Sequence, residues 1–240
     1  MTELQPGLPG RWAHVVKELH EAEAKAGRPE GSVRLLAVGK TFGAEALLQC
    51  AELGARTFGE NYAQEGCAKV DWFREHHPEL QLEWHFIGPL QANKTRGVAE
   101  RFDWVQSIDR LRIAERLSAQ RPAGMPPLNL LIEVNIDGEE TKSGVKPEDL
   151  EDLARAVEAL PNVRLRGLMA IPAPADAHEE RMKPLLAMRT LFAQFQKAHP
   201  QADTLSMGMS ADLEEAVEAG STMVRIGRAI FGERFYGNRV

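Results

Sequence analysis

Eight short apolar segments recur along this chain of 240 residues, and segments with helical spacing separate them. A short apolar run bounded by turn residues is typical of a buried strand, whereas apolar residues at every third or fourth position indicate a helix. Regular alternation of the two predicts a parallel sheet with helices outside it. The predicted strands are residues 33–40, 55–60, 82–88, 103–108, 128–136, 163–171, 204–207 and 222–226.

The segments between these strands predict helices, and one additional helix precedes the first strand at about residues 11–26. Asp109 and Ser210 are each expected to cap the helix that follows them, because their side chains can accept from the free N–H groups of a first turn. The helices after the strands are expected at residues 44–53, 61–76, 93–102, after Asp109, after Pro147, at 180–198, at 211–219 and at 228–235.

Eight strand–helix units in a chain of this length predict an α/β fold with a single (β/α)₈ TIM barrel domain. We expect one domain over residues 1–240, with the barrel at about 33–233 behind the N-terminal helix. The alternative is an open doubly wound sheet. Such a sheet usually carries a glycine-rich fingerprint after its first strand, and "GKTFGAE" does not match it.

Composition and charge exclude several classes of function. The net charge is −6 and no long basic block is present, so neither nucleic acid nor an anionic membrane is an expected partner. The start of the chain, "MTELQPGLPGRW", lacks the pattern of a signal peptide, so we expect a cytoplasmic protein. Cys50 and Cys67 share no metal-type spacing. We therefore expect no metal site and reduced thiols, with a disulfide between them as the alternative.

Lys40 follows the apolar run "LLAV" at the end of the first predicted strand. The active site of a (β/α)₈ barrel lies at this end of its strands. Apolar neighbours tend to lower the pKa of a lysine, and a partly neutral lysine forms Schiff bases with aldehydes. The alternative is a lysine whose stem packs on the barrel rim while its amine reaches water or a carboxylate.

The loops after the seventh and eighth strands form a candidate phosphate site. Barrels often bind phosphate there, through backbone N–H groups at the start of a helix. Gly208 and Gly227 would let the backbone approach a ligand, and Arg228 adds positive charge. The alternative is that these residues only form turns and caps. The carboxylate of Asp212 would repel a phosphate unless it points away.

A small molecule with both an aldehyde and a phosphate would fit Lys40 and these loops together, and pyridoxal 5′-phosphate (PLP) is the candidate cofactor. Arg225 alternates with Val224 and Ile226, so its side chain should point to the opposite face of the strand. There it could face the pyridine nitrogen of PLP and keep it unprotonated. The alternative is an ion pair with Glu60 or Glu133.

Several stretches resemble the YggS/PROSC family of PLP-binding proteins, the pyridoxal phosphate homeostasis proteins. They are "LLAVGKT", "FGENYAQE", "WHFIGPLQANK", "EVNIDGEETKSGV", "GLMAIP" and "LSMGMSADLEEAVEAGSTMVRIGRAIFG", within about residues 33–233. The resemblance implies a fold like the N-terminal barrel of alanine racemase. It also implies that Lys40 carries PLP as a Schiff base.

The resemblance further implies which residues surround the cofactor. Asn61 would lie near the ring and Arg225 would face its nitrogen, while His85 and Met169 would line the pocket. The phosphate would lie among Ser206, Gly208, Met209, Ser210, Gly227 and Arg228. Two positions depart from the family, which often has Ser or Thr where this chain has Gly39 and Arg228.

Members of this family are thought to hold and buffer PLP, and to pass it to apo-enzymes, without a turnover reaction. In the related racemases a tyrosine from a further domain of a partner subunit acts as the second base. Here the barrel takes up almost the whole chain, and only Tyr62 and Tyr236 are tyrosines. We therefore expect a non-catalytic PLP carrier, and the resemblance implies a monomer. The alternatives are a PLP-dependent racemase using His85 or Tyr62, and a lysine-dependent aldolase for a phosphorylated sugar.

Overall fold

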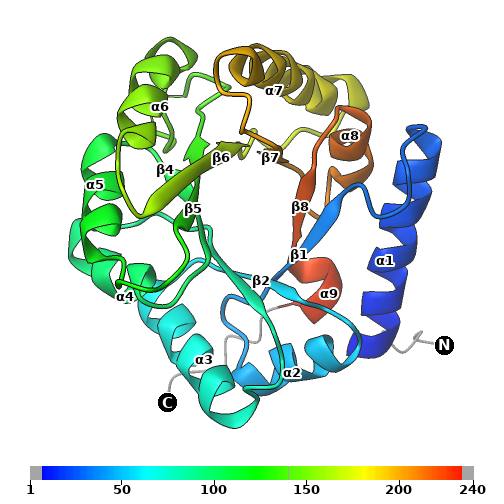
Figure 1. Cartoon of the computed structure of the whole chain (residues 1–240). Helices are drawn as coiled ribbons and strands as arrows, with labels where there is room; N and C mark the ends of the chain where they lie inside the picture. The colour runs from blue at the N-terminus through cyan, green and yellow to red at the C-terminus, as the bar shows by residue number, and fades with distance from the viewer. Residues whose placement is uncertain (1–6, 140, 234–240) are drawn as a thin grey trace, which may run out of the picture.

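The computed structural model describes residues 7–139 and 141–233 of the chain (Figure 1). Eight parallel strands follow one another in chain order, and β8 pairs with β1 to close the barrel. The predicted fold class is therefore confirmed. The strands are β1 (Arg34–Val38), β2 (Thr57–Glu60), β3 (Glu83–Phe86), β4 (Trp104–Ile108), β5 (Leu128–Glu133), β6 (Val163–Met169), β7 (Thr204–Ser206) and β8 (Met223–Ile226).

The helices form a ring around the barrel, and α1 stands beside α8, next to β8 and β1 (Figure 1). Their apolar faces cover the outside of the sheet, so the strands are buried on both faces. The helices are α1 (Leu8–Lys25), α2 (Ala44–Glu52), α3 (Ala63–His76), α4 (Thr95–Ala99), α5 (Leu111–Gln120), α6 (Leu150–Glu158), α7 (His178–Ala198), α8 (Leu213–Glu218) and α9 (Arg228–Phe231). Short 3₁₀ turns precede two of them, η1 (Ala92–Lys94) and η2 (Pro147–Asp149).

Two predicted helix caps are wrong. Arg110 takes the N-cap position of α5, no side chain caps that helix, and the carboxylate of Asp109 accepts hydrogen bonds from Arg110 instead. Asp212 takes the N-cap position of α8, so this helix begins two residues later than expected and Ser210 lies in the preceding loop. In both cases the chain needs one or two more residues to turn from the strand into the helix.

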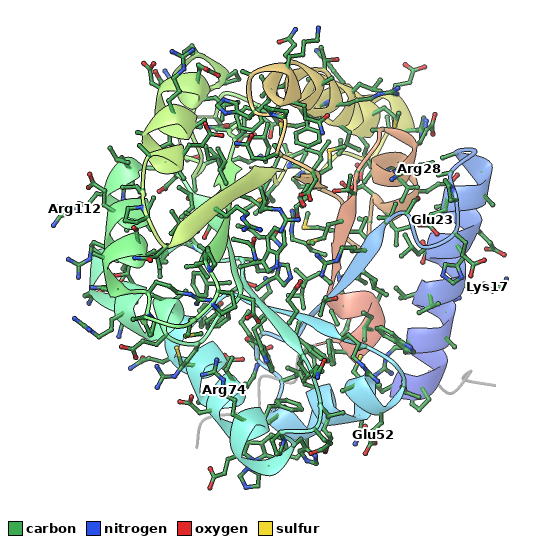
Figure 2. All side chains as sticks on the ribbon, in the orientation of Figure 1. Lys17, Glu23, Arg28, Glu52, Arg74 and Arg112 are labelled. Atoms are coloured by element: carbon green, nitrogen blue, oxygen red, sulfur yellow. The ribbon has the colours of Figure 1, made fainter. Side chains whose placement is uncertain are left out.

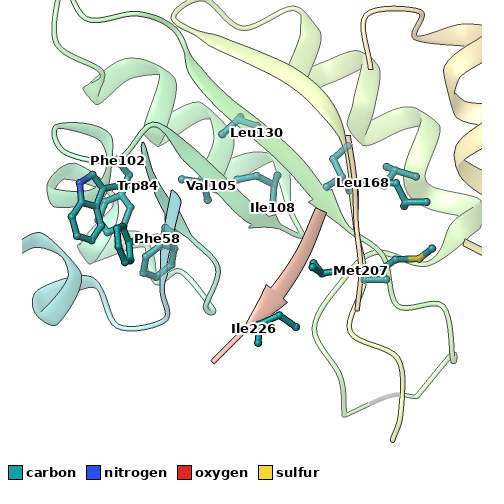
Figure 3. Close-up of a cluster of buried hydrophobic side chains, with 14 of the residues drawn as sticks. Phe58, Trp84, Phe102, Val105, Ile108, Leu130, Leu168, Met207 and Ile226 are labelled. Atoms are coloured by element: carbon teal, nitrogen blue, oxygen red, sulfur yellow. The ribbon is translucent and has the colours of Figure 1, made fainter. Parts of the chain in front are cut away.

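Most of the core lies between the sheet and the helices. In β1, Ala37 belongs to this outer core, so Leu36 and Val38 point into the barrel, because successive strand residues face opposite sides. Figure 3 shows part of the outer core, where aromatic rings from β2, β3 and the segment after α4 meet aliphatic side chains of later strands. The labelled residues there are Phe58, Trp84, Phe102, Val105, Ile108, Leu130, Leu168, Met207 and Ile226.

The inside of the barrel combines apolar and polar side chains. Two small apolar clusters lie there, formed by Leu36, Val38, Ile87 and Met223 and by Trp104, Leu131 and Met169. Between them lie four polar residues that are at most 5% exposed, namely His85, Gln106, Ser206 and Arg225. Bulky aliphatic side chains usually dominate such an interior. A column of buried polar groups therefore needs an explanation.

Two ionic side chains, buried Glu23 in α1 and partly buried Arg28 just after it, attach this region to the barrel. The Glu23 carboxylate accepts hydrogen bonds from Gly31 N–H at 2.9 Å and Val33 N–H at 2.7 Å. Arg28 donates to the carbonyls of Val217 at 3.0 Å and Ser221 at 2.7 Å. In Figure 2 both lie on the barrel side of α1, whereas other labelled side chains, Lys17, Glu52 and Arg112, point outward.

The two cysteines are free thiols, and burial raises the pKa of Cys50 to about 12. A thiol in that state is a poor nucleophile at neutral pH. None of the helices within residues 7–139 and 141–233 is long and apolar enough to cross a membrane.

Candidate functional site

A pocket of about 640 Å³ opens at the C-terminal ends of the strands. Its walls come from the ends of β1, β2, β3, β6, β7 and β8 and from the loops that follow them. The volume lies in the usual range for small-molecule sites. Seven residues that were predicted from the sequence line it together: Lys40, Asn61, Met209, Ser210, Arg225, Gly227 and Arg228.

Lys40 lies two residues after the end of β1, and buried Lys69 of α3 fixes the turn that carries it. Lys69 Nζ donates to the carbonyl of Gly39 at 2.8 Å. It also donates to the carboxylates of Glu60 at 2.8 Å and Glu65 at 2.7 Å. An ammonium with three acceptors is fully satisfied, so Lys69 is well suited to hold this turn in one conformation.

The other side of the turn is held through Glu65. Its Oε1 accepts from the Thr41 N–H at 2.6 Å. Thr41 has a φ of 72°, a left-handed conformation that is unfavourable for a β-branched residue. The hydrogen bonds to Gly39 and Thr41 therefore fix the backbone on both sides of Lys40 and offset the strain at Thr41.

The packing around residue 39 explains why this chain has glycine where the family often has serine or threonine. A Cβ atom at this position would lie 2.8 Å from Leu47 Cδ1 and 3.0 Å from Glu60 Oε1. Leu47 is fully buried in α2, so it has little room to move away. Leu47 therefore fills the space that a serine or threonine side chain before Lys40 would need.

Glu60 lies beneath the turn with one oxygen bound and one unpartnered. Its Oε2 is buried without a hydrogen-bond partner in the described part of the chain. Burial raises the pKa of Glu60 to about 7, although the charges of Lys69 and Lys40 lower it. The core beneath the turn that carries Lys40 therefore contains an acid that changes its protonation near neutral pH.

Arg225 points into the barrel as predicted from its alternation with Val224 and Ile226, which pack in the outer core. Its Nη1 donates to Ser206 Oγ at 2.8 Å and its Nη2 to the carbonyl of Ala170 at 2.9 Å. Both acceptors are neutral. Arg225 therefore does not form the ion pair with Glu60 or Glu133 that was the alternative. Burial lowers the pKa of Arg225 to about 10, which leaves the guanidinium charged at neutral pH.

The guanidinium still has donors to offer a ligand. An arginine carries five N–H groups, and hydrogen bonds within residues 7–139 and 141–233 account for two of those on Arg225. Because Arg225 also lines the pocket, the remaining donors are available there.

Backbone N–H groups supply a second set of donors. Within the described residues, those of Ser210, Ala211 and Arg228 donate to no protein group, and all three residues line the pocket. The N–H of Met209 is already used, because it donates to Asp212 Oδ1 at 2.7 Å. The Asp212 carboxylate therefore points back into its own loop and away from the pocket. A phosphate site requires this orientation, because a carboxylate facing the pocket would repel the phosphate.

Four predicted residues lie outside the pocket lining. Met169 packs against Trp104 and Leu131 inside the barrel. Gly208 has a φ of 100°, and a Cβ there would lie 2.5 Å from the Cβ of Ala216, so helix packing requires this glycine. The other two, His85 and Ser206, are fully buried and hydrogen-bonded to Gln106.

The pocket also contains residues that the sequence prediction missed. They are Val38, Phe42, Ile87, Ile171, Pro174, Ala211, Gly232 and Glu233. Most are apolar, and an apolar residue after a strand does not distinguish a pocket wall from a core position. Val38 and Ile87 had the clearest signal, because each ends or follows a strand on the barrel's inner face. Gly232 and Glu233 follow α9, where no strand end marks them.

These groups fit PLP. Lys40 offers an amine for its aldehyde, Arg225 offers donors to a ring nitrogen, and the loops after β7 and β8 offer N–H groups to a phosphate. Asn61 adds a separate indication, because its Oδ1 is buried without a partner and the residue lines the pocket. A buried amide oxygen of this kind is costly unless a ligand or water satisfies it.

Comparisons with known proteins agree with this geometry. Residues 14–235 match the family model for the alanine racemase N-terminal domain. A pyridoxal phosphate homeostasis protein of Vibrio cholerae is 55% identical over 93% of this chain and 94% of its own length. The solved structure of PipY from Synechococcus elongatus with PLP bound is 33% identical, with a TM-score of 0.76, over 89% of this chain and all of that one.

A more distant solved structure supports the fold alone. Alanine racemase from Corynebacterium glutamicum is 20% identical with a TM-score of 0.67, and the match covers 95% of this chain and 62% of the racemase. The family model and the curated relatives both cover nearly all of this chain. The chain therefore belongs to the alanine racemase N-terminal domain family and, within it, to the pyridoxal phosphate homeostasis proteins.

Proposed function

We propose that this protein binds PLP in the pocket at the C-terminal end of the barrel, holds it by a Schiff base on Lys40, and serves in PLP homeostasis without catalytic turnover. The carrying observation is that one pocket brings together Lys40, Arg225 and the uncommitted N–H groups of Ser210, Ala211 and Arg228. The names of the relatives and the PLP-bound PipY structure support the same cofactor.

Each polar group in the pocket then has one task. PLP supplies, when bound, an aldehyde carbon to which an amine can bond with loss of water. Lys40 supplies that amine from a turn that Lys69 holds in place. Arg225 presents N–H donors toward the ring nitrogen and so opposes its protonation. Ser210 and its neighbours in the loops after β7 and β8 donate backbone N–H groups to the phosphate.

Arg228 replaces the hydroxyl that this family often has at its position. Its backbone N–H lines the pocket without an acceptor, and its exposed side chain adds a positive charge at the rim. A charged donor strengthens a hydrogen bond to phosphate. The substitution thus exchanges a hydroxyl contact for an electrostatic one.

The pocket supports binding better than racemisation. A racemase needs a second acid or base at the substrate, and the two candidates from the sequence are poorly placed. His85 is fully buried outside the pocket lining and is bonded to Glu83 and Gln106. Tyr62 is 53% exposed and does not line the pocket. Tyr236 lies outside the described residues.

The wider role is also part of this proposal. We propose a cytoplasmic monomer that acts as a single domain and passes PLP to apo-enzymes. The contacts of Glu23 and Arg28 support one domain, because they attach α1 to the barrel.

Titration of the purified protein with PLP, followed by its near-visible absorbance, tests the proposal. The wild type should gain a band that Lys40→Ala lacks, while the exposed control Lys17→Ala keeps it. Incubation of the loaded protein with L-alanine or L-serine should leave optical purity unchanged. A wild type that gains no band would contradict the cofactor assignment, and racemisation that Lys40→Ala abolishes would contradict the non-catalytic role.

A further inference from the structure

A chain of four hydrogen bonds runs through the barrel from the pocket toward its opposite end. Arg225 Nη1 donates to Ser206 Oγ at 2.8 Å, and Ser206 Oγ contacts Gln106 Oε1 at 2.6 Å. Gln106 Nε2 contacts His85 Nδ1 at 2.8 Å, and His85 Nε2 contacts Glu83 Oε1 at 2.6 Å. Four strands, β8, β7, β4 and β3, supply these five side chains.

The two ends of the chain fix the direction of every bond in it. The guanidinium of Arg225 can only donate, so Ser206 Oγ accepts from it, and the Ser206 hydrogen points to Gln106 Oε1. At the far end the Glu83 carboxylate can only accept, so His85 must carry its hydrogen on Nε2. His85 Nδ1 is then a free acceptor for the Gln106 amide. All four hydrogens therefore point from the pocket toward Glu83.

Each inner member is fully buried, which makes the alternative arrangement costly. Reversing Gln106 would place its NH₂ group against the Ser206 hydroxyl and its oxygen against His85 Nδ1. His85 would then need its hydrogen on Nδ1, and a bare Nε2 would face the Glu83 carboxylate at 2.6 Å. Stacking on Trp104, with ring centroids 5.1 Å apart, holds the plane of the imidazole.

We propose that Glu83, His85 and Gln106 are positioning residues, which hold the Arg225 guanidinium toward the pocket by fixing the hydrogen of Ser206. Glu83 begins β3, at the end of the barrel opposite the pocket, and also pairs with Arg34. A change at Glu83 can therefore reach the ligand through this chain or through Arg34 of β1, whereas a change at Gln106 acts through the chain. The inference deepens the proposed function, on which it rests, because it concerns the residue that would face the ring nitrogen of PLP.

The first test needs no ligand. Nitrogen NMR of ¹⁵N-histidine-labelled protein without PLP should show His85 in the neutral form with its hydrogen on Nε2. In Glu83→Ala this preference should be lost, and in Glu83→Gln it should be kept, because the glutamine oxygen can still accept. A wild-type His85 with its hydrogen on Nδ1 would overturn the inference.

The second test measures the effect on the pocket. Glu83→Ala and Gln106→Leu should each weaken PLP binding about tenfold, since a buried donor or acceptor in the chain loses its partner. They should also change the absorbance spectrum of bound PLP, because Arg225 is no longer held toward the ring. Glu83→Gln should restore both properties most of the way. Asp203→Ala is the matched control, because Asp203 is an exposed carboxylate just before β7 that pairs with Arg166 outside this chain.

The outcomes separate this inference from the proposed function. Wild-type binding and spectrum in Glu83→Ala would refute the positioning role even though PLP binds. Failure of the wild type to bind PLP would refute the proposed function, and the NMR result would still decide whether the chain of hydrogen bonds has the direction given above.

Discussion

At the residue scale, the account depends on how neighbouring side chains hold Lys40 and Arg225. For both residues, contacts from other strands and helices help to hold the side chain or its backbone in place. Lys69 and Glu65 hold the backbone around Lys40, while Ser206 and the carbonyl of Ala170 hold Arg225. Preorganisation of this kind lowers the free energy needed to order a site when a ligand binds.

Replacing Lys69 should show how much the turn contributes. Lys69→Met removes the donor to Gly39 and leaves Glu60 buried without its ion pair. We expect a loss of folding stability of about 3 kcal/mol, together with a decrease in PLP affinity on the order of tenfold for the folded protein. Chemical denaturation and absorbance titration measure the two effects. Lys17→Met, on the exposed face of α1, should change neither. Unaltered affinity in Lys69→Met would show that the turn keeps its conformation without Lys69.

The site residues differ in how far the sequence could predict them. Lys40 was predictable because it follows an apolar strand at the end of the barrel where active sites lie. Arg225 was predictable because its alternation with Val224 and Ile226 gives the direction of its side chain. Gln106 and Lys69 were missed, because their roles depend on partners from other strands and helices. A glutamine in a strand and a lysine in a helix carry no local signal of such a partner.

At the scale of elements, the order of strands and helices followed from periodicity, whereas their ends did not. β1 and β3 are shorter than expected, because the chain leaves the sheet before Lys40 and Ile87, which line the pocket beyond the strand ends. The caps expected at Asp109 and Ser210 failed because each lies one or two positions before the residue at which the backbone turns into the helix, Arg110 and Asp212.

The attachment of α1 can be tested at this scale. Glu23→Ala leaves the N–H groups of Gly31 and of buried Val33 without their acceptor in the loop before β1. We expect a loss of about 2 to 3 kcal/mol in the free energy of unfolding. Glu21→Ala, two residues away on the exposed face, should cost far less. Equal stability of the two variants would mean that α1 contributes little to the fold. Denaturant unfolding followed by circular dichroism measures this difference.

At the scale of the whole molecule, the barrel tolerates buried acids near its pocket at a cost in stability that depends on pH. Burial raises the pKa of Glu133 to about 7, with a further rise from Asp109 and a decrease from Arg225. The unfolded chain has the ordinary value near 4.5. Between pH 4.5 and about pH 7, the folded protein therefore binds the Glu133 proton more tightly than the unfolded chain does. Stability from this group is therefore lost as pH rises through that window.

Glu133→Gln should remove that pH dependence. We expect the variant and the wild type to have similar stability at pH 4, where both side chains are neutral. At pH 8 the variant should be more stable by roughly 3 kcal/mol, from 1.36 kcal/mol for each pKa unit. Denaturant unfolding at the two pH values measures this difference, with the exposed Glu148→Gln as control. If Glu133→Gln and the wild type were equally stable at pH 8, ionisation of Glu133 would not destabilise the folded protein, and the prediction would be wrong.

The most direct test of the central claim is to locate the covalent bond. The protein is incubated with PLP, reduced with borohydride and digested, and the peptides are analysed by mass spectrometry. We predict one pyridoxyl-phosphate addition, on the peptide that contains Lys40. An unmodified Lys40 peptide, with the added mass on another lysine or on none, would contradict the account.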